Sequence, residues 1–299
     1  MNLLQLFNQF QANDDAVKFL EQIRWKNGVI CTKCGSSKTC KHHVKDKQKK
    51  WQCWNCHHSF SVTVGTIFHH THIPLNKWFW LISLMLNAKK GLSACQAARD
   101  LGMRRPTVWS MMHRIRKAME TDQADLLKGI VEMDETYVGG KPRKENKDDD
   151  DDTPPSPRGR GTKKTPVVGM VERGGNVKTV ATSKFELKSR DLNKLIRNHV
   201  DLDETILVTD EYKGYAKVKD LICHLTINHQ KAYAEGDIHT NTIESFWAIL
   251  KRGVIGQFHK VSKKYLQNYL HEFEYRYNRR KQHSDTTFQD LLENMCYSR

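Results

Sequence analysis

The sequence lacks an apolar run long enough to cross a membrane. A span needs roughly 18 consecutive apolar residues, and the best candidate, Trp78–Leu86, is short and flanked by Lys77 and Lys89–Lys90. This run predicts a buried helix instead. The first residues, Met1–Phe7, also lack the basic start and the small-residue cleavage site of a signal peptide. We therefore expect no membrane partner.

A disulfide framework is also missing. Four of the eight cysteines form two CxxC pairs, whereas Cys40, Cys95, Cys223 and Cys296 are scattered along the chain. This usage is typical of metal binding in a reducing cytosol rather than of a secreted, cross-linked protein. The expected location is therefore cytoplasmic.

Acidic residues are too few to balance the basic ones. Lys and Arg number 49 against 34 Asp and Glu, which leaves a net charge of +15 over 299 residues. Such an excess can serve solubility alone, but an acidic partner, most simply nucleic acid, accounts for it better. The length predicts about two domains.

Two CxxC pairs predict a zinc ribbon. Their four thiols belong to Cys31, Cys34, Cys53 and Cys56. Positions 35–52 separate the pairs, a spacing that places four thiolates tetrahedrally around a structural zinc ion. The alternatives are four unliganded thiols, or a competing ligand from His57–His58. With four thiolates already spaced, we expect the histidines to lie at the surface.

Residues 92–109 have the pattern of a helix-turn-helix. A small-residue helix ends at Gly102, and a second helix begins near Arg105–Thr107. The side chains predicted to face DNA are Arg104, Arg105, Thr107, Ser110, His113 and Arg114. Such patterns also arise by chance, so simple helical packing remains the alternative.

Residues 141–164 cannot form a packed core. They contain Asp148–Asp152, then three prolines and an Arg-Gly repeat, which predicts a flexible acidic insertion. The aspartate run could be mistaken for a metal site, but without fixed geometry solvated charge is the better interpretation.

Strand-like and helix-like runs alternate from residue 129 onward. Residues 167–171 and 177–181 predict a hairpin, residues 187–200 a helix and residues 205–209 a buried strand. This alternation predicts a mixed sheet flanked by helices.

Three acids have the contexts that a two-metal site requires. Asp134 lies inside the strand-like run 130–138, Asp210 ends the run 206–210, and Glu244 begins a helix-like run. Carboxylates that converge from two strands and a helix can hold two divalent ions about 4 Å apart, which activate the attacking oxygen and stabilise the leaving one. Mg²⁺ suits such a site because it takes few protein carboxylates.

Each acid also has a simpler explanation. Asp134 could lie on an exposed strand face, although its neighbours are apolar, and Asp210 could begin a turn with Gly214. Asn241-x-x-Glu244 has the form of a capping box, in which Glu244 would accept a backbone N–H. Lys251, two helical turns after Glu244, favours a catalytic role because it could contact a phosphate on the same face.

Three ordered motifs carry a resemblance to a known family. They are residues 131–140 (VEMDETYVGG), 208–215 (VTDEYKGY) and 239–247 (HTNTIESFW), with Arg24-Trp25 and 276–280 (RYNRR) in support. Together with the CxxC pairs they resemble insertion-sequence transposases of the ISXO-two-like, or IS-fifteen-ninety-five, family, over nearly the whole chain. The acidic insertion does not map onto these motifs.

The resemblance implies a DDE site with two Mg²⁺ or Mn²⁺ ions. Asp134 and Asp210 would ligate both ions and Glu244 would complete one site. Some family members use asparagine as the third ligand, so Asn241 competes with Glu244, although the Glu244–Lys251 spacing favours the acid. The implied phosphate contacts are Lys251, Arg252 and Arg279–Lys281.

The expected architecture is a multidomain α+β or α/β protein. It comprises a helical lead-in at 1–27, a zinc ribbon at 28–73, a helix-turn-helix segment at 74–125 and a ribonuclease H-like core at 126–299. The resemblance implies a nucleoid-associated homo-oligomer, a dimer or larger, that binds terminal inverted repeats, cleaves the strands and joins them to target DNA. The alternatives are a DNA-binding regulator with an inactive core and a nuclease that cannot join.

Overall fold

The computed structural model describes residues 3–43, 49–120, 126–139, 164–183, 187–227 and 239–297. The chain divides into two compact units, residues 1–120 with 281–299 and residues 121–280. Most of the predicted acidic insertion lies outside the described residues. In the described part, no helix is both long and apolar enough to span a membrane.

A small antiparallel sheet forms the ribbon of the first unit. Its strands are β1 (Thr39–His43), β2 (Lys49–Cys53) and β3 (Ser59–Phe60), in that order. Helix α2 (Asn13–Arg24) packs beside the ribbon, because Trp51 donates its indole N–H to Glu21 at 2.7 Å. The predicted boundary between a lead-in and a ribbon at residue 28 therefore divides elements that pack together.

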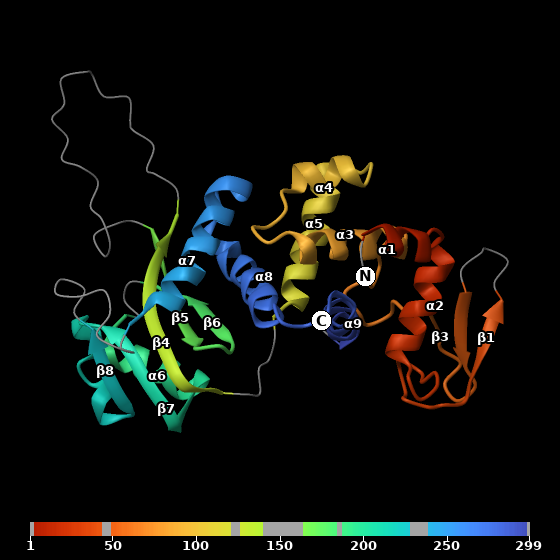
Figure 1. The fold of residues 1–299 in the computed structure, drawn as a ribbon. Coiled ribbons are helices and arrows are strands. Elements are labelled where there is room, and N and C mark those ends of the chain that lie inside the picture. Colours follow the sequence, from red (N-terminus) through yellow and green to blue (C-terminus); the bar gives the residue numbers. More distant parts are fainter. Residues whose placement is uncertain are drawn as a thin grey trace, which may run out of the picture. The chain divides into compact units, whose positions relative to one another are not determined.

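Helices complete the first unit (Figure 1). They are α1 (Leu3–Gln9), α3 (Leu75–Asn87), α4 (Ala94–Asp100), α5 (Arg105–Ala118) and α9 (Ser284–Tyr297). The apolar run at 78–86 is the buried helix α3, as predicted, with Trp78 and Phe79 fully buried. Helices α4 and α5 are joined by a short turn at Gly102, whose φ of +60° glycine adopts without strain.

The C-terminal helix corrects one predicted boundary. Helix α9 contacts α2, α3 and α5, and the Ile67 N–H donates to the Met295 carbonyl at 3.1 Å. The second unit therefore ends near residue 280 rather than at 299. The sequence pattern of α9 marks it as a helix but does not show which core it joins.

A mixed five-stranded sheet forms the second unit. Its order is β6-β5-β4-β7-β8. The strands are β4 (Leu127–Val138), β5 (Thr165–Glu172), β6 (Val177–Ala181), β7 (Val200–Asp210) and β8 (Cys223–Ile227). The first three are antiparallel neighbours, and β7 and β8 run parallel to β4. The mixed sheet and the hairpin at 167–181 are confirmed.

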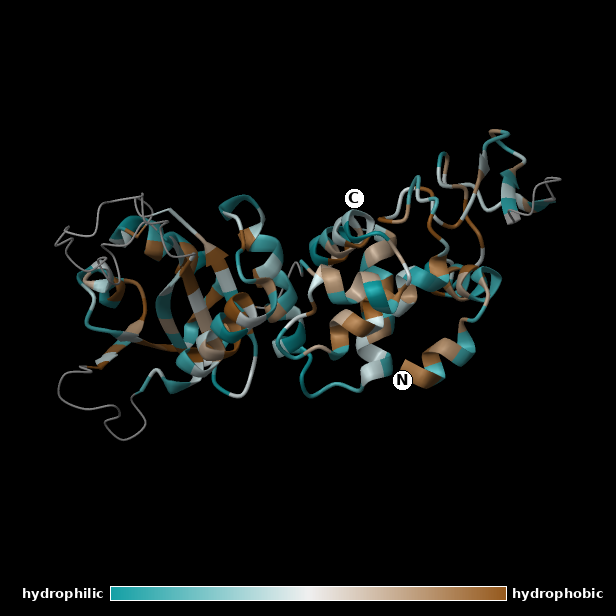
Figure 2. Ribbon diagram, turned by 90° about the horizontal axis from the view of Figure 1, so that it is seen from above, coloured by the Kyte–Doolittle hydropathy of each residue, from teal (hydrophilic) through white to brown (hydrophobic). Residues whose placement is uncertain are grey.

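Helices lie on both faces of this sheet (Figure 1). They are α6 (Ser189–His199), α7 (Asn241–Gly253) and α8 (Leu266–Asn278). One apolar cluster joins Val131 and Met133 of β4 to α6, and another joins Val167 and Val171 of β5 to α7 and α8. The sheet strands are accordingly among the hydrophobic elements in Figure 2, and even-numbered residues of β4 face α7.

Helix α8 satisfies the outer edge of β6 with side chains. Asn278 accepts the Val177 N–H at 2.7 Å and donates to its carbonyl at 3.0 Å. Glu274 accepts from the N–H and hydroxyl of Thr179, and Gln267 accepts the Ala181 N–H at 2.8 Å. These polar groups of an edge strand are therefore paired without a sixth strand.

Candidate active site and metal centre

The four predicted thiols converge at one point of the ribbon. All four Sγ atoms lie within 4.8 Å of one another, and the Cys31–Cys56 and Cys34–Cys53 pairs are each 3.6 Å apart. Zinc–sulfur bonds of about 2.3 Å in a tetrahedron require sulfurs roughly 3.8 Å apart. The cluster therefore fits a zinc ion with four thiolate ligands.

The two CxxC pairs adopt matching backbone turns, and the neighbouring histidines are not part of the thiol cluster. The N–H of Gly35 donates to the Cys31 carbonyl, and that of His57 to the Cys53 carbonyl, both at 2.9 Å. Gly35 and His57 have φ of +72° and +56°, so they occupy equivalent positions in two matching turns. His58 stacks on Phe60. The described metal-binding cluster contains only cysteines.

Hydrogen bonding prepares one thiol of the cluster for a metal. Burial disfavours the Cys31 thiolate, but the N–H groups of Cys34 and Lys33 and the neighbouring thiols outweigh burial. Together they lower the pKa of Cys31 to about 6. A thiolate is the form that ligates zinc.

The second unit brings Asp134 and Asp210 together. Parallel strands β4 and β7 pair Met133 with Thr209, so the next residue on each strand is a catalytic candidate. Both aspartates line a cavity of about 800 Å³ together with Lys251, Lys164 and other residues. Two carboxylates beside two lysines provide ligands for a divalent ion and contacts for a phosphate.

Asp134 lies in an environment that disfavours its charge. Burial and then the nearby charges of Glu135 and Asp210 raise the pKa of Asp134 from 3.8 to about 7, against the hydrogen bonds that it accepts. One of these comes from the indole N–H of Trp247 in α7, at 3.0 Å. A cation bound here would reverse this unfavourable balance of charge.

The alternative that Asp210 forms a turn is also observed. Its Oδ1 accepts the Tyr212 N–H at 3.1 Å, while its carboxylate lines the cavity. Tyr215 lies in the turn that follows and donates its hydroxyl to Glu135 at 2.7 Å. Burial and the charge of Glu135 raise the pKa of Tyr215 well above its ordinary value, so the hydroxyl remains a donor.

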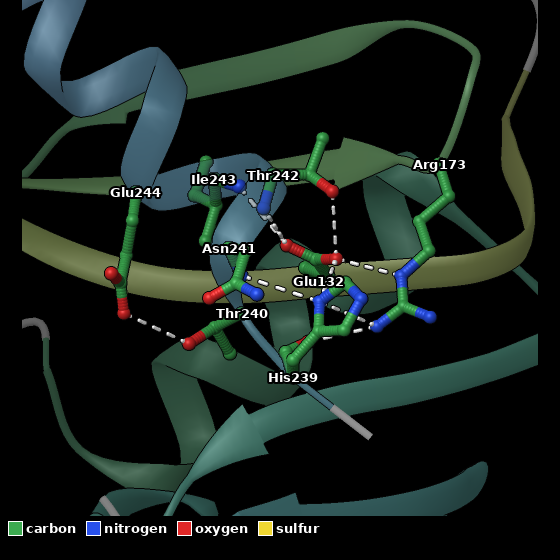
Figure 3. Close-up of polar contacts among 8 residues, drawn as sticks. All are labelled: Glu132, Arg173, His239, Thr240, Asn241, Thr242, Ile243 and Glu244. Carbon is green, nitrogen blue, oxygen red and sulfur yellow. Dashed lines mark hydrogen bonds and ion pairs between the residues drawn. The ribbon is translucent and has the colours of Figure 1, made fainter. Parts of the chain in front are cut away.

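The start of α7 differs from the capping box suggested by the sequence. The N-cap residue, Thr240, makes no side-chain capping hydrogen bond. Instead, the buried carboxylate of Glu132 in β4 accepts the N–H groups of Thr242 and Ile243 at 2.8 and 3.0 Å (Figure 3). Glu244 accepts the hydroxyl of Thr240 at 3.2 Å. The N–H groups of Thr242 and Ile243 therefore bind Glu132 rather than Glu244.

Neither candidate third ligand lies among the residues that line the cavity. Asn241 and Glu244 are both exposed in the first turns of α7. In Figure 3 the Glu244 carboxylate points toward Thr240, and Asn241 lies beside His239. The structure therefore brings together Asp134, Asp210 and Lys251, and the third ligand stays a prediction.

Two family models match parts of this chain. Residues 126–278 match the ISXO2-like transposase domain, which is slightly more than half of the chain, and residues 12–59 match the transposase zinc-ribbon domain. The chain belongs to the ISXO2-like transposase family. The matched domain ends at residue 278, two residues before the end of the second unit at residue 280.

Two relatives of this transposase are also similar to it in sequence. A protein of the transposable element ISH50 from Halobacterium salinarum is 28% identical over 274 residues, covering 89% of this chain and 91% of the relative. A transposase-like protein from Haemophilus influenzae is 34% identical over 94 residues, covering 31% of this chain and 74% of the relative.

Solved structures show only distant similarity to the transposase chain. The Mos1 strand transfer complex aligns at 14% identity with a TM-score of 0.24, covering 66% of this chain and 75% of that chain. The mariner Mos1 paired-end complex with Mg aligns at 14% identity with a TM-score of 0.25, covering 93% and 94%.

Several predicted DNA contacts of the transposase make intramolecular contacts. Arg114 lies over the Trp78 ring and donates to the His69 carbonyl at 3.1 Å. Arg279 and Arg280 stack on tyrosine rings at 3.8 and 4.0 Å. If these three guanidinium groups bound DNA, they would have to give up this packing. Their contacts with DNA stay predictions.

The remaining basic candidates are exposed. Arg104 and Arg105 are exposed at the start of α5, where Thr107 is half-buried. Lys251 and Arg252 are exposed in the last turn of α7. Exposure makes these side chains available to a phosphate, although basic residues also stabilise a helix C-terminus.

Three residues that position the site were not predicted from the sequence. Glu132 and Trp247 hold α7 against β4, and Gly169 lies opposite Asp134 on β5. One signal was present in the sequence: Glu132 shares the strand face of Asp134 and lies between apolar residues. Its partners, however, are about 110 residues away in sequence.

Gly169 provides the space that lets Trp247 reach Asp134. A Cβ at this position would lie 2.5 Å from the indole ring and 2.9 Å from Ile243. Gly169→Ala should therefore destabilise the transposase by about 1–3 kcal/mol through overpacking, and should displace Trp247 from Asp134. Thermal unfolding and tryptophan fluorescence measure both effects. Gly256→Ala is the control because no atom lies within 4 Å of the added methyl; equal stability of the two variants would contradict the prediction.

Because the pKa of Asp134 is raised, replacing this residue should stabilise the folded protein, and the gain should depend on pH. Between pH 3.8 and about 7 the unfolded chain has lost a proton that the folded chain keeps, so stability falls as the pH rises. A pKa raised from 3.8 to about 7 corresponds to at most about 4 kcal/mol of lost stability. Asp134→Asn should therefore raise the melting temperature at pH 8 but not at pH 4, in magnesium-free buffer that retains zinc. A loss of stability at pH 8 would refute this interpretation.

Proposed function

We propose that this transposase binds the terminal inverted repeats of its element, cleaves a DNA strand at each end and joins the freed end to target DNA. The observation that carries the proposal is the pair Asp134 and Asp210, side by side on parallel strands in a cavity that Lys251 also lines. Membership of the ISXO2-like transposase family supports it.

Metal ions in this cavity would activate the attacking oxygen and stabilise the leaving oxygen. Asp134 and Asp210 are the ligands that we propose for two Mg²⁺ or Mn²⁺ ions, with Glu244, or else Asn241, as the third. Lys251 would hold a non-bridging phosphate oxygen. The second unit would then be a ribonuclease H-like core, which the mixed sheet supports.

The proposed reaction has two steps, hydrolysis and strand transfer. Water attacks the phosphorus at the element end, the bond to the 3′-oxygen breaks, and that oxygen leaves as a 3′-hydroxyl. The 3′-hydroxyl then attacks a phosphorus of the target strand and loses its proton, and the displaced target 3′-oxygen takes up a proton and leaves as a hydroxyl. One phosphodiester forms as another breaks, so the second step needs no energy source and no covalent enzyme intermediate.

The first unit would bind double-stranded DNA through its ribbon and through the start of α5. Arg104, Arg105 and Thr107 are our proposed contacts there, and the net charge of +15 supports them. Synapsis of two ends would require a homo-oligomer, a dimer or larger. Genomic DNA as substrate implies action in the cytoplasm, in association with the nucleoid.

The test uses duplex DNA that carries the sequences flanking this gene, with Mg²⁺ or Mn²⁺ and a separate target. We expect nicks with 3′-hydroxyl ends and then joined products. Glu244→Gln and Asn241→Ala, assayed side by side, identify the third ligand by the larger loss. Cutting without joining would indicate a nuclease, and end binding without cutting would indicate a regulator.

A further inference from the structure

We propose that Glu132 is a positioning residue that fixes the start of α7, and with it the third metal ligand, relative to Asp134. This inference rests on the proposed function. Glu132 lies two residues before Asp134 on the same face of β4, because strand side chains alternate. Its side chain is fully buried, although the charge of a buried carboxylate costs stability unless it is paired.

The contacts of Glu132 explain how the buried charge is tolerated. Its Oε2 accepts the N–H groups of Thr242 and Ile243, and its Oε1 accepts the Thr242 hydroxyl at 2.8 Å. Arg173 donates to Oε1 at 2.7 Å, and its guanidinium also donates to the His239 carbonyl at 2.9 Å (Figure 3). A carboxylate at the positive end of a helix is further stabilised by the helix dipole.

Two contacts with β4 lie on either side of Glu244 along the helix. Thr242 and Ile243 bind Glu132, and Trp247 binds Asp134. A rotation or slide of α7 along β4 would break these contacts. The backbone of Glu244 is therefore held between two fixed points of the strand that also carries Asp134.

The position of the Glu244 side chain makes this anchoring functionally relevant. Its carboxylate accepts the Thr240 hydroxyl and is not among the groups lining the cavity. With the helix backbone fixed, Glu244 would join the ligand set by side-chain rotation in this proposal. Rotation costs less than movement of a packed helix, so Glu132 would improve metal binding without contacting the metal.

The experiment measures Mn²⁺ binding by the full-length, zinc-loaded chain, with free Mn²⁺ followed by electron paramagnetic resonance. Glu132→Gln should weaken Mn²⁺ binding at least about tenfold, as loss of outer-shell support typically does. An amide in place of the carboxylate turns an NH₂ group toward groups that all donate. Thr242→Val removes one donor and should weaken binding roughly three- to tenfold, which keeps the test valid if Glu132→Gln unfolds.

Glu274→Gln is the matched control, since Glu274 is equally buried and also accepts a backbone N–H, but in the contact of α8 with β6. It should leave Mn²⁺ affinity unchanged. The double variant Glu132→Gln/Glu244→Gln should bind Mn²⁺ no more weakly than Glu244→Gln, because both changes act through one ligand. Unchanged affinity in Glu132→Gln and Thr242→Val, with binding by the wild type, would overturn the positioning role alone. No binding by the wild type would overturn the proposed function as well.

Discussion

Asp210→Asn is expected to reduce DNA cleavage by about three orders of magnitude or more while leaving end binding nearly unchanged. The amide keeps an oxygen that can accept the Tyr212 N–H, so the turn after β7 should persist. It removes the negative charge that a divalent ion requires. The loss of rate corresponds to about 4 kcal/mol of transition-state stabilisation. Single-turnover cleavage and gel-shift assays measure the two effects separately.

Asp220→Asn is the control for this prediction. It makes the same change of charge at an exposed position of the same unit, away from the residues that line the cavity. We expect cleavage within twofold of the wild type, since exposed charges have small effects (about 1 kcal/mol or less). An equal loss of end binding and cleavage in Asp210→Asn would show that Asp210 is architectural.

Cys53→Ser is expected to release zinc and unfold the ribbon. Cys53 is fully buried among the four thiols, and serine cannot replace a thiolate as a zinc ligand. Structural zinc contributes roughly 10–16 kcal/mol of folding free energy in small domains at neutral pH, which exceeds the stability that three short strands could provide. Zinc content should fall to near zero, and end binding should weaken with it.

Cys40→Ser separates loss of zinc from loss of a cysteine. Cys40 is in β1 of the same ribbon but outside the thiol cluster, so this variant should retain its zinc. Metal analysis and proteolysis of the ribbon compare the two variants. Unchanged zinc stoichiometry in Cys53→Ser would exclude the four-cysteine site.

Local patterns in the sequence predicted the thiol cluster and the pair of neighbouring aspartates. The CxxC spacing gave the thiol cluster, and the apolar flanks of Asp134 and the strand end at Asp210 gave the acid pair. Each pattern reflects a constraint within a few residues, such as strand alternation or a metal-binding turn. Residue types alone left open whether His57 competes as a zinc ligand. Its φ of +56°, which places it in the turn after Cys53, is known only from the structure.

Long-range packing was the part that the sequence could not predict. No pattern in the sequence connects Glu132 with Thr242, whose hydroxyl it accepts, and Glu244 matched a capping box whose role Glu132 takes instead. Helix α9 was placed in the wrong unit, because helix periodicity identifies an apolar face but not its partner. In each case the missing information was which distant element supplies the contact.

Helix α8 blocks the addition of a strand at the β6 edge of the sheet. Three of its side chains bind main-chain N–H groups of β6 that an added strand would need, so pairing at that edge would first require the helix to detach. Among the described strands, β8 is the other terminal strand of the sheet. In the oligomer on DNA that we propose, identical sheets would come close together. A β6 edge covered by α8 would then exclude one route to open-ended edge-to-edge polymerisation.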